Sequence, residues 1–184
     1  WAMSLFLFTF LKPILFMNKL FNENAIDTMQ RIGKVVDVVL TSPPYNTSRT
    51  GASDKYNSRY DTFHDAKTDD DYIKWTIDIF NGYDNVLKQN GVVLYNISYS
   101  SENTSLIWLL IAEIIKKTSF TTADCIVWKK KSAIPNNRSA NKLTRICEYV
   151  FVFCRKNEID TFMCNKAVVS KIEKTGQNNY ENVF

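Results

Sequence analysis

The residues best suited to chemistry stand together at positions 41–45, where the sequence reads Thr-Ser-Pro-Pro-Tyr. Prolines end a strand, because proline has no amide hydrogen for the ladder. A strand-ending turn explains the two prolines, but not the hydroxyl before them or the aromatic ring after them. A hydroxyl, a rigid carbonyl and a ring side by side can accept hydrogen bonds and stack. The segment therefore predicts a site as well as a turn.

The segment Ser42-Pro43-Pro44-Tyr45 resembles the (D/N/S)PP(Y/F) motif of DNA methyltransferases that act on adenine N6 or cytosine N4. An exocyclic amino nitrogen is a poor nucleophile, because its lone pair is delocalised into the base. Two acceptors, one for each N–H, hold this nitrogen towards tetrahedral geometry and free the lone pair. The resemblance assigns these two roles to the Ser42 side chain and the Pro43 carbonyl, which the prolines preorganise.

The same resemblance implies the rest of the site. Tyr45 would stack on a base flipped out of the duplex, through the face of its ring rather than its hydroxyl. The methyl donor would be S-adenosylmethionine, and no covalent enzyme intermediate is needed. Asn22–Ile26 is similar to the family's NGDAL-type segment, which implies a cofactor contact by Asn24; Thr41 and Ser42 are the other residues expected to contact the cofactor. Ser at position 42 favours cytosine N4, because adenine enzymes more often carry Asp or Asn there.

A second region carries the resemblance further along the chain. Ile126-Val127-Trp128-Lys129, Pro135-Asn136, Arg145 and Glu148–Phe153 are similar to the family segment IIWxK…PN…R…HEYIxxF, with Cys147 in place of His. The segment around Asn90-Gly91 is similar to a family strand that follows the long helix, although an ordinary helix stop explains it equally well. The order of the motifs matches the permuted group, in which the catalytic half comes first.

Double-stranded DNA is the expected partner. A basic segment would reach its phosphates, and the segment 46–67 mixes aromatic and basic side chains as base-stacking surfaces do. A solvated loop is the alternative for both segments. The net charge of +4 permits a nucleic-acid partner without requiring one. The candidate DNA-binding residues are Tyr56, Arg59, Tyr60, Lys129, Lys130, Lys131, Arg138, Lys142 and Arg145.

These residues need a framework, and the pattern of strands and helices predicts an α/β fold. We expect a partial Rossmann-like methyltransferase sheet with its early strands parallel and its last two strands antiparallel. Asn90-Gly91 is expected to end the long helix, and residues 155–184 carry little pattern. The predicted strands are 35–40, 91–97, 123–128 and 148–154, and the predicted helices are 24–31, 69–89 and 103–117.

Composition bounds the function class. Hydrophobic residues make up 45% of the 184 residues, which is enough for a globular core. The four cysteines and single histidine lack zinc-site spacing, so no metal is expected. Residues 1–16 are apolar but too short for a comfortable membrane span. We predict that residues 1–16 are a non-native or unstructured overhang with few contacts. Residues 17–184 are expected to be the catalytic half of a methyltransferase domain. The protein is expected to be cytoplasmic. A membrane or signal segment is the alternative for 1–16.

The family's glycine-rich FxGxGT turn has no counterpart here, because no two of the five glycines form a GxG. In the permuted order that turn would follow residue 184, so we expect a missing C-terminal cofactor half or a complementary chain. The sequence thus predicts a DNA amino-methyltransferase from a restriction–modification system or a phage. The alternatives are a DNA-binding fragment without catalysis, and a methyltransferase acting on RNA or protein.

Overall fold

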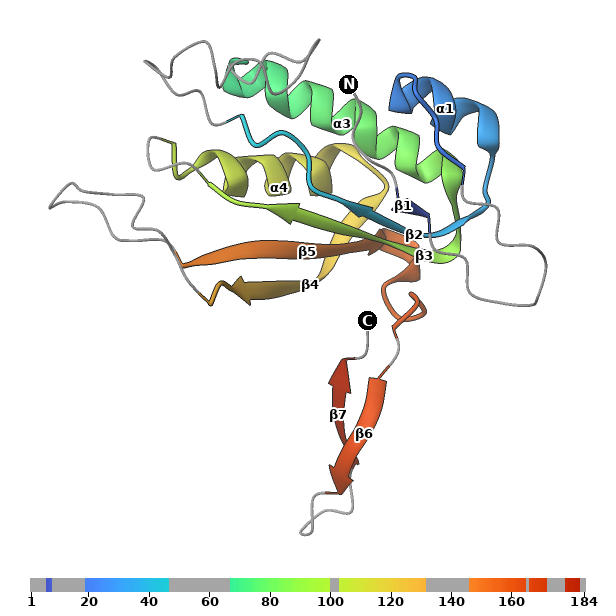
Figure 1. The fold of residues 1–184 in the computed structure, drawn as a ribbon, viewed down its shortest axis with the longest axis vertical. Helices are drawn as coiled ribbons and strands as arrows, with labels where there is room; N and C mark the ends of the chain where they lie inside the picture. Colours follow the sequence, from blue (N-terminus) through green and yellow to red (C-terminus); the bar gives the residue numbers. More distant parts are fainter. Residues whose placement is uncertain are drawn as a thin grey trace, which may run out of the picture.

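The computed structural model describes residues 6–7, 19–46, 67–99, 103–131, 146–164, 166–171 and 178–182. Figure 1 shows helices packed on a central sheet and a separate hairpin. In chain order the elements are β1 Phe6–Leu7, α1 Ala25–Ile32, β2 Val36–Thr41, α3 Asp69–Val86, β3 Leu87–Ile97, α4 Leu106–Lys117, β4 Phe120–Lys129, β5 Cys147–Arg155, the 3-10 helix η1 Lys156–Glu158, β6 Lys166–Lys171 and β7 Asn178–Asn182.

The central sheet has the strand order β1-β2-β3-β5-β4. β2 and β3 are parallel, with α3 in the connection between them, while β5 pairs antiparallel with both β3 and β4. The predicted α/β class, the parallel early strands and the antiparallel last pair are therefore confirmed. The apolar, β-branched sequence of β2 suits a strand with one face in a core.

Helix α3 begins where the sequence analysis places it, at a Thr cap followed by three aspartates. The Thr68 side chain accepts a hydrogen bond from the Asp71 amide at 3.2 Å. The expected end of this helix is wrong: α3 stops at Val86, and Asn90-Gly91 lies inside β3. Asn90 has φ 61°, and the pairing with β2 shifts register beside it, as at a bulge. Gly91 fits there because a Cβ would lie 3.0 Å from the Asp37 carbonyl oxygen.

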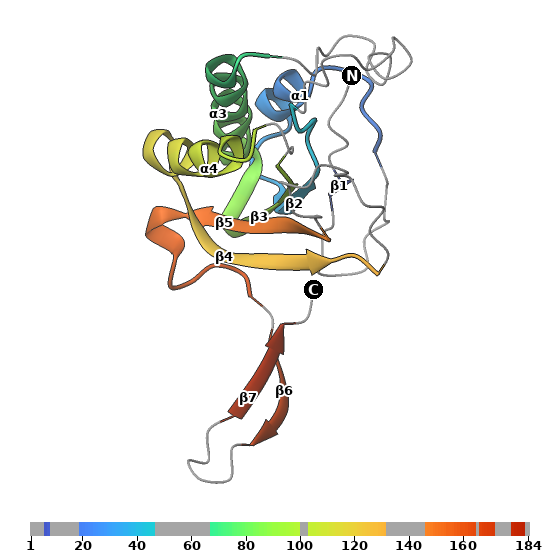
Figure 2. The ribbon, with the colours of Figure 1, turned by 90° about the vertical axis from the view of Figure 1, so that its left-hand side faces the viewer.

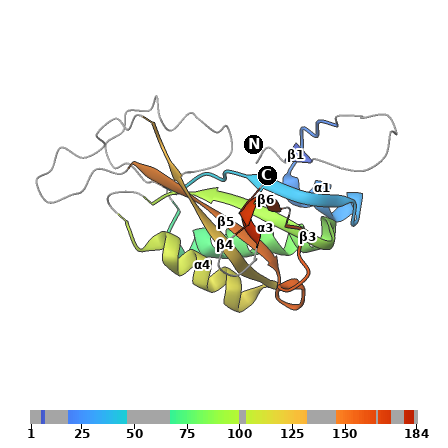
Figure 3. The same cartoon turned by 90° about the horizontal axis from the view of Figure 1, so that it is seen from below.

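Helices α1, α3 and α4 cover one face of the sheet, as Figures 1 and 2 show. Figure 3 presents the opposite side, with the sheet in front of the helices. Phe80 of α3 is fully buried at the centre of the core, where its ring meets Tyr95 at 5.3 Å and Phe153 at 4.9 Å between centroids. The helix-covered face of β3 and β5 therefore holds the hydrophobic core, while Val127 and Trp128 near the end of β4 are exposed.

The two ends of the chain depart from expectation. Phe6 and Leu7 form β1, which pairs antiparallel with Leu40 and Val39 on the edge of β2. This dipeptide does contact the sheet, whereas few contacts were expected of residues 1–16; the rest of that segment lies outside the described residues. Towards the other end, β6 and β7 form a two-stranded antiparallel sheet in a region for which the sequence predicted little pattern.

Candidate functional site

The sheet topology brings four strand ends to one edge. β2 and β3 run parallel and end there at Thr41 and Ile97, with Thr41 paired to Tyr95. β5 runs antiparallel to β3, so its first residues reach the same edge, and Ile97 pairs with Tyr149. β4 arrives beside β5, where Trp128 pairs with Glu148. Residues distant in sequence can therefore form one site at the carboxyl ends of the parallel strands, where α/β sheets usually bind ligands.

The Ser-Pro-Pro-Tyr segment forms the turn that leaves β2 at this edge. Pro43 and Pro44 are buried, while Ser42 between Thr41 and the prolines is exposed. The buried Tyr72 of α3 donates its hydroxyl hydrogen to the Pro44 carbonyl oxygen at 2.6 Å. This hydrogen bond joins the turn to α3, the helix that connects the two parallel strands. Its Ser42 side chain is left accessible on a rigid backbone.

The Tyr45 hydroxyl lies at the centre of a polar network. It is 2.8 Å from Ser42 Oγ, and it accepts a hydrogen bond from Asn96 Nδ2 at 3.0 Å. It donates to Glu148 Oε2 over a longer 3.4 Å, and Asn96 Nδ2 also donates to that oxygen at 3.1 Å. Lys130 Nζ donates to the other carboxylate oxygen, Glu148 Oε1. Five side chains from four segments are joined in this way.

The network keeps Glu148 in its anionic form. Burial by itself would raise the pKa of this carboxyl group. Hydrogen bonds from Lys130, Asn96 and Tyr45, with the positive charge of Lys130, outweigh burial, so the pKa lies below the ordinary value for glutamate. Glu148 therefore only accepts hydrogen bonds near neutral pH.

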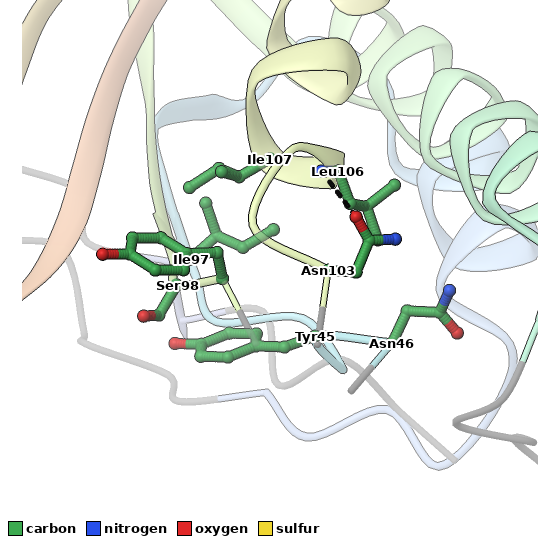
Figure 4. Close-up of a pocket in the computed structure, with 8 residues that line it drawn as sticks. Tyr45, Asn46, Ile97, Ser98, Asn103, Leu106 and Ile107 are labelled. Carbon is green, nitrogen blue, oxygen red and sulfur yellow. Dashed lines mark hydrogen bonds between the residues drawn. The ribbon is translucent and has the colours of Figure 1, made fainter. Parts of the chain in front are cut away.

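A shallow pocket opens beside the Tyr45 ring. It contains about 230 Å³ of space free of atoms, open solvent included. Figure 4 shows the Tyr45 ring on one side of the pocket and the first turn of α4, with Leu106 and Ile107, on the other. Tyr99 adds a second aromatic wall and stacks on Tyr149 at 6.4 Å between ring centroids. The pocket is lined by apolar and aromatic side chains together with the polar side chains of Asn46, Ser98 and Asn103.

Asn46, the residue after Tyr45, is hydrogen-bonded to Lys67 at the far end of segment 47–66. Its side chain donates to the Lys67 carbonyl oxygen at 2.9 Å and accepts from the Lys67 amide at 2.8 Å. Asn46 is buried and has φ 51°, a conformation that asparagine tolerates better than most residues. The two ends of segment 47–66 are therefore held together next to Tyr45.

The predicted cofactor residues are not all brought together. Ser42 is exposed at the site, but Thr41 is buried, as alternation along a strand requires for consecutive residues. Asn24 caps α1, and its side chain accepts from the Ile26 amide at 3.0 Å. Asn24 is therefore engaged in capping and is not a member of the Ser42–Tyr45 network.

The predicted DNA-binding residues divide into three groups. Lys129 and Lys131 are exposed at the end of β4, at the same edge as Tyr45. Lys130 lies between them but is paired with Glu148. The remaining six lie outside the described residues: Tyr56, Arg59, Tyr60, Arg138, Lys142 and Arg145.

Two residues of the network, Asn96 and Glu148, were not among the predicted site residues. Both could have been found from one signal, a polar residue within an otherwise apolar strand: Asn96 in VVLYNI and Glu148 in CEYVFVFC. Burying a polar group in such a strand costs free energy unless it has partners.

Within the described ranges, no group of His, Cys, Asp and Glu could hold a metal ion, and no helix is long and apolar enough to cross a membrane.

Comparisons with solved structures show the fold. The cytosine-N4-specific PvuII DNA methyltransferase superposes with a TM-score of 0.53 at 14% identity, over 71% of this chain and 46% of that chain. M1.HpyAVI gives a TM-score of 0.47 at 18% identity, over 82% of this chain and 58% of that one. Its complex with SAM gives 0.49 at 18%, over 83% and 60%. The chain spans roughly half the length of these structures.

Sequence comparison identifies the family directly. A search of curated proteins finds no match. The model of the N6/N4 methyltransferase family, described as DNA methylase, matches residues 36–184, from the first residue of β2 onward. The match includes the Ser-Pro-Pro-Tyr turn, the pocket and the Glu148 network. The chain belongs to the N6/N4 DNA methylase family.

Proposed function

We propose that this chain is the catalytic half of an enzyme that methylates an exocyclic amino group of a base in double-stranded DNA, with S-adenosylmethionine as the methyl donor. One observation carries the proposal. The exposed Ser42 hydroxyl and the Pro43 backbone stand on a turn that Tyr72 fastens, directly beside the Tyr45 ring and its pocket. This is the arrangement that an amino group on a flat ring needs.

The residues of the turn would act on the amino group by hydrogen bonding. Ser42 Oγ accepts from one N–H and the Pro43 carbonyl oxygen from the other, which frees the nitrogen lone pair. Buried prolines hold this carbonyl in place, so little reorganisation is needed when the substrate reacts. The Tyr45 ring stacks on the base, which must leave the duplex to reach a pocket of this kind. We favour cytosine N4 over adenine N6 because position 42 is Ser.

The described residues fit the substrate side of the reaction better than the cofactor side. A bound S-adenosylmethionine supplies an electrophilic methyl group. Ser42 lies where the amino group would meet that methyl group, but Thr41 is buried and Asn24 caps a helix. Gly82 packs on Met29 and Gly91 on the Asp37 carbonyl, so neither opens a turn for the cofactor. A glycine-rich segment outside this sequence, in the same protein or in a complementary chain, would complete the cofactor site.

DNA would meet the edge of the sheet through its phosphates. Lys129 and Lys131 are exposed there and have the charge for such contacts. A cytoplasmic location and a role in a restriction–modification system belong to the same proposal.

A second candidate is a DNA-binding fragment without catalysis. The observation that favours it is the lack of a GxG among the five glycines of the sequence. Calorimetry on the chain together with a glycine-rich half separates the two candidates: the proposed enzyme would bind S-adenosylmethionine as well as duplex DNA, whereas a fragment without catalysis would bind DNA only. Binding of the cofactor by this chain would remove the second candidate.

The test of the proposed function is Ser42→Ala in an enzyme that supplies the glycine-rich half. The substitution removes one of two acceptors for the amino group. We expect methyl transfer from labelled cofactor to duplex DNA to fall about 10²–10³-fold, the usual loss for one preorganised polar group. DNA affinity should change little, since phosphate contacts supply most of it.

Two results would contradict the proposal. A parent rate in Ser42→Ala would reduce the motif to a strand-ending turn. Transfer of label by the parent to RNA or protein, and not to DNA, would show that the substrate class is wrong.

A further inference from the structure

The Tyr45 hydroxyl is bound from outside its own motif. Asn96 comes from the end of β3 and Glu148 from the start of β5, 51 and 103 positions away in sequence. Both residues reach the hydroxyl at the sheet edge described above. If only the ring face of Tyr45 contributed to function, phenylalanine could replace it. The polar residues Asn96 and Glu148 would then have no reason to lie within otherwise apolar strands.

Glu148 is the anchor of this network. Its side chain is only 15% exposed, so an unpaired carboxylate would be costly there. Lys130 binds one carboxylate oxygen, and Asn96 and Tyr45 bind the other. Hydrogen bonds to an ionised group are stronger than those between neutral groups. The position of the carboxylate is therefore well determined.

The network also determines where the hydroxyl protons point. A carboxylate can only accept, so the Tyr45 hydroxyl hydrogen is directed to Glu148. Asn96 Nδ2 can only donate, so it occupies one lone pair of the Tyr45 oxygen. Ser42 Oγ lies 2.8 Å from that oxygen, in a contact where either hydroxyl can be the donor; when the Tyr45 hydrogen is donated to Glu148, the donor is Ser42. With that hydrogen turned towards Tyr45, the lone pairs of the exposed Ser42 Oγ can accept a hydrogen bond from a substrate.

We propose that Glu148, held by Lys130 and Asn96, is a positioning residue that orients the hydroxyls of Tyr45 and Ser42 so that Ser42 Oγ accepts from the substrate amino group. The proposal rests on the proposed function. It assigns Lys130 to the site rather than to a DNA phosphate. It also revises the expectation that only the ring face of Tyr45 matters: Tyr45→Phe removes the acceptor for the Ser42 hydrogen and should slow the reaction.

The first test is single-turnover methyl transfer at saturating DNA, in the enzyme used for Ser42→Ala. Tyr45→Phe and Glu148→Gln should each lower the rate about tenfold, the effect of one ordinary hydrogen bond. The double variant should be little slower than either one, because both act through the same hydroxyl. Glu113→Gln, the same substitution in an exposed ion pair on α4, should keep the parent rate. A parent rate in Glu148→Gln, or full additivity in the double variant, would overturn the proposal.

Lys130 provides a second test, because a phosphate contact and a positioning role predict different readouts. Lys130→Met should lower the single-turnover rate and leave the salt dependence of DNA binding unchanged, and Lys130→Arg should restore most of the rate. Lys131→Met, by contrast, should reduce the salt slope by about 1, as loss of a phosphate contact does. If Lys130→Met lowers the salt slope at a parent rate, Lys130 belongs to the DNA surface and the proposal fails for it.

Hydrogen exchange decides the proposal even if the parent methylates nothing. In that case the proposed function fails, but the network can still be examined in the chain itself. Glu148→Gln should speed exchange of the Tyr45 and Asn46 amides several-fold, because the turn loses its anchor, while Glu113→Gln should leave both amides unchanged. Equal exchange in the parent and in Glu148→Gln would show that Glu148 does not hold the turn.

Discussion

Asn46 illustrates how one side chain can perform two structural tasks beside the site. It adopts φ 51° and binds both backbone groups of Lys67. A pair of reciprocal hydrogen bonds across 21 positions closes the segment that leaves Tyr45. The side chain of Asn46 therefore fixes how the chain leaves the motif and returns at Lys67.

The substitutions Asn46→Ala and Asn46→Gly separate these two tasks. Alanine loses the hydrogen bonds and is strained at positive φ, whereas glycine loses only the hydrogen bonds. Because the Lys67 groups are partly buried, we expect each variant to lower the free energy of unfolding by about 1–3 kcal/mol in urea titrations. If Asn46→Gly is as stable as the parent, backbone conformation is the important task and the hydrogen bonds contribute little.

Thr41 and Ser42 show the limit of assigning roles from a motif alone. The two residues are adjacent, yet Thr41 is 4% exposed and Ser42 is exposed. Side chains alternate across a strand, so only one of two neighbours can face a ligand outside the sheet. Ser42 thus remains a candidate for contact with substrate and cofactor, and the cofactor contact of the buried Thr41 stays a prediction.

At the scale of the elements, the junction between α3 and β5 depends on one buried arginine. The last turn of α3 contains no basic residue. Arg155, at the end of β5, supplies the missing charge and donates to the carbonyl oxygens of Asp84, Leu87 and Lys88 at 3.1, 2.8 and 2.9 Å. It also pairs with the carboxylates of Asp84 and Glu158. The helix end is therefore capped by a distant strand.

Replacing Arg155 by methionine should weaken this junction. The substitution leaves helix carbonyls and the largely buried Glu158 carboxylate without their partner. Breaking a buried ion pair from one side typically costs about 3–5 kcal/mol, and we expect a loss of that order in urea unfolding. Lys116→Met is the control, because its ion pair with Glu113 is exposed and should contribute less than about 1 kcal/mol. A similar small loss for both variants would mean that water replaces Arg155 at the helix end.

At the scale of the whole molecule, the helices cover one face of the sheet and the strand ends gather the site at one edge (Figures 1 and 2). The outer edge of β2 is paired with β1 through Phe6 and Leu7 alone among the described residues. A pairing of this length adds few net hydrogen bonds. The Ser-Pro-Pro-Tyr turn and its network are built from β2 onward, so their geometry depends on residues after the 1–16 segment.

Deleting residues 1–16 should therefore leave the protein folded. We expect the free energy of unfolding to change by less than about 2 kcal/mol, since two paired residues contribute roughly one net hydrogen bond each. Solubility should be equal or better, because the deleted segment is mostly apolar. Denaturant titration and sedimentation of both forms measure these outcomes. Unfolding of the shortened chain would show that the segment is part of the domain.

The local features of this protein could be predicted from short sequence patterns. The Ser-Pro-Pro-Tyr motif, the strand before it and the two long helices follow from patterns within short windows, because proline chemistry, capping and apolar periodicity act between near neighbours. The same patterns implied the α/β class and the family. Even the error at Asn90-Gly91 has a local cause: an Asn-Gly pair also suits a bulge, and only pairing with β2 distinguishes that from a helix stop.

Only the tertiary structure decided how the site is held. Asn96 and Glu148 are 52 positions apart, and their contact depends on the register of β3 against β5. Tyr72 reaches Pro44 because α3 packs beneath the turn. No short window contains such pairs, since register and packing are set by the whole hydrophobic core. The residues proposed to accept from the amino group were therefore predicted from the sequence, whereas the contacts that join Tyr45, Asn96 and Glu148 depend on the tertiary structure.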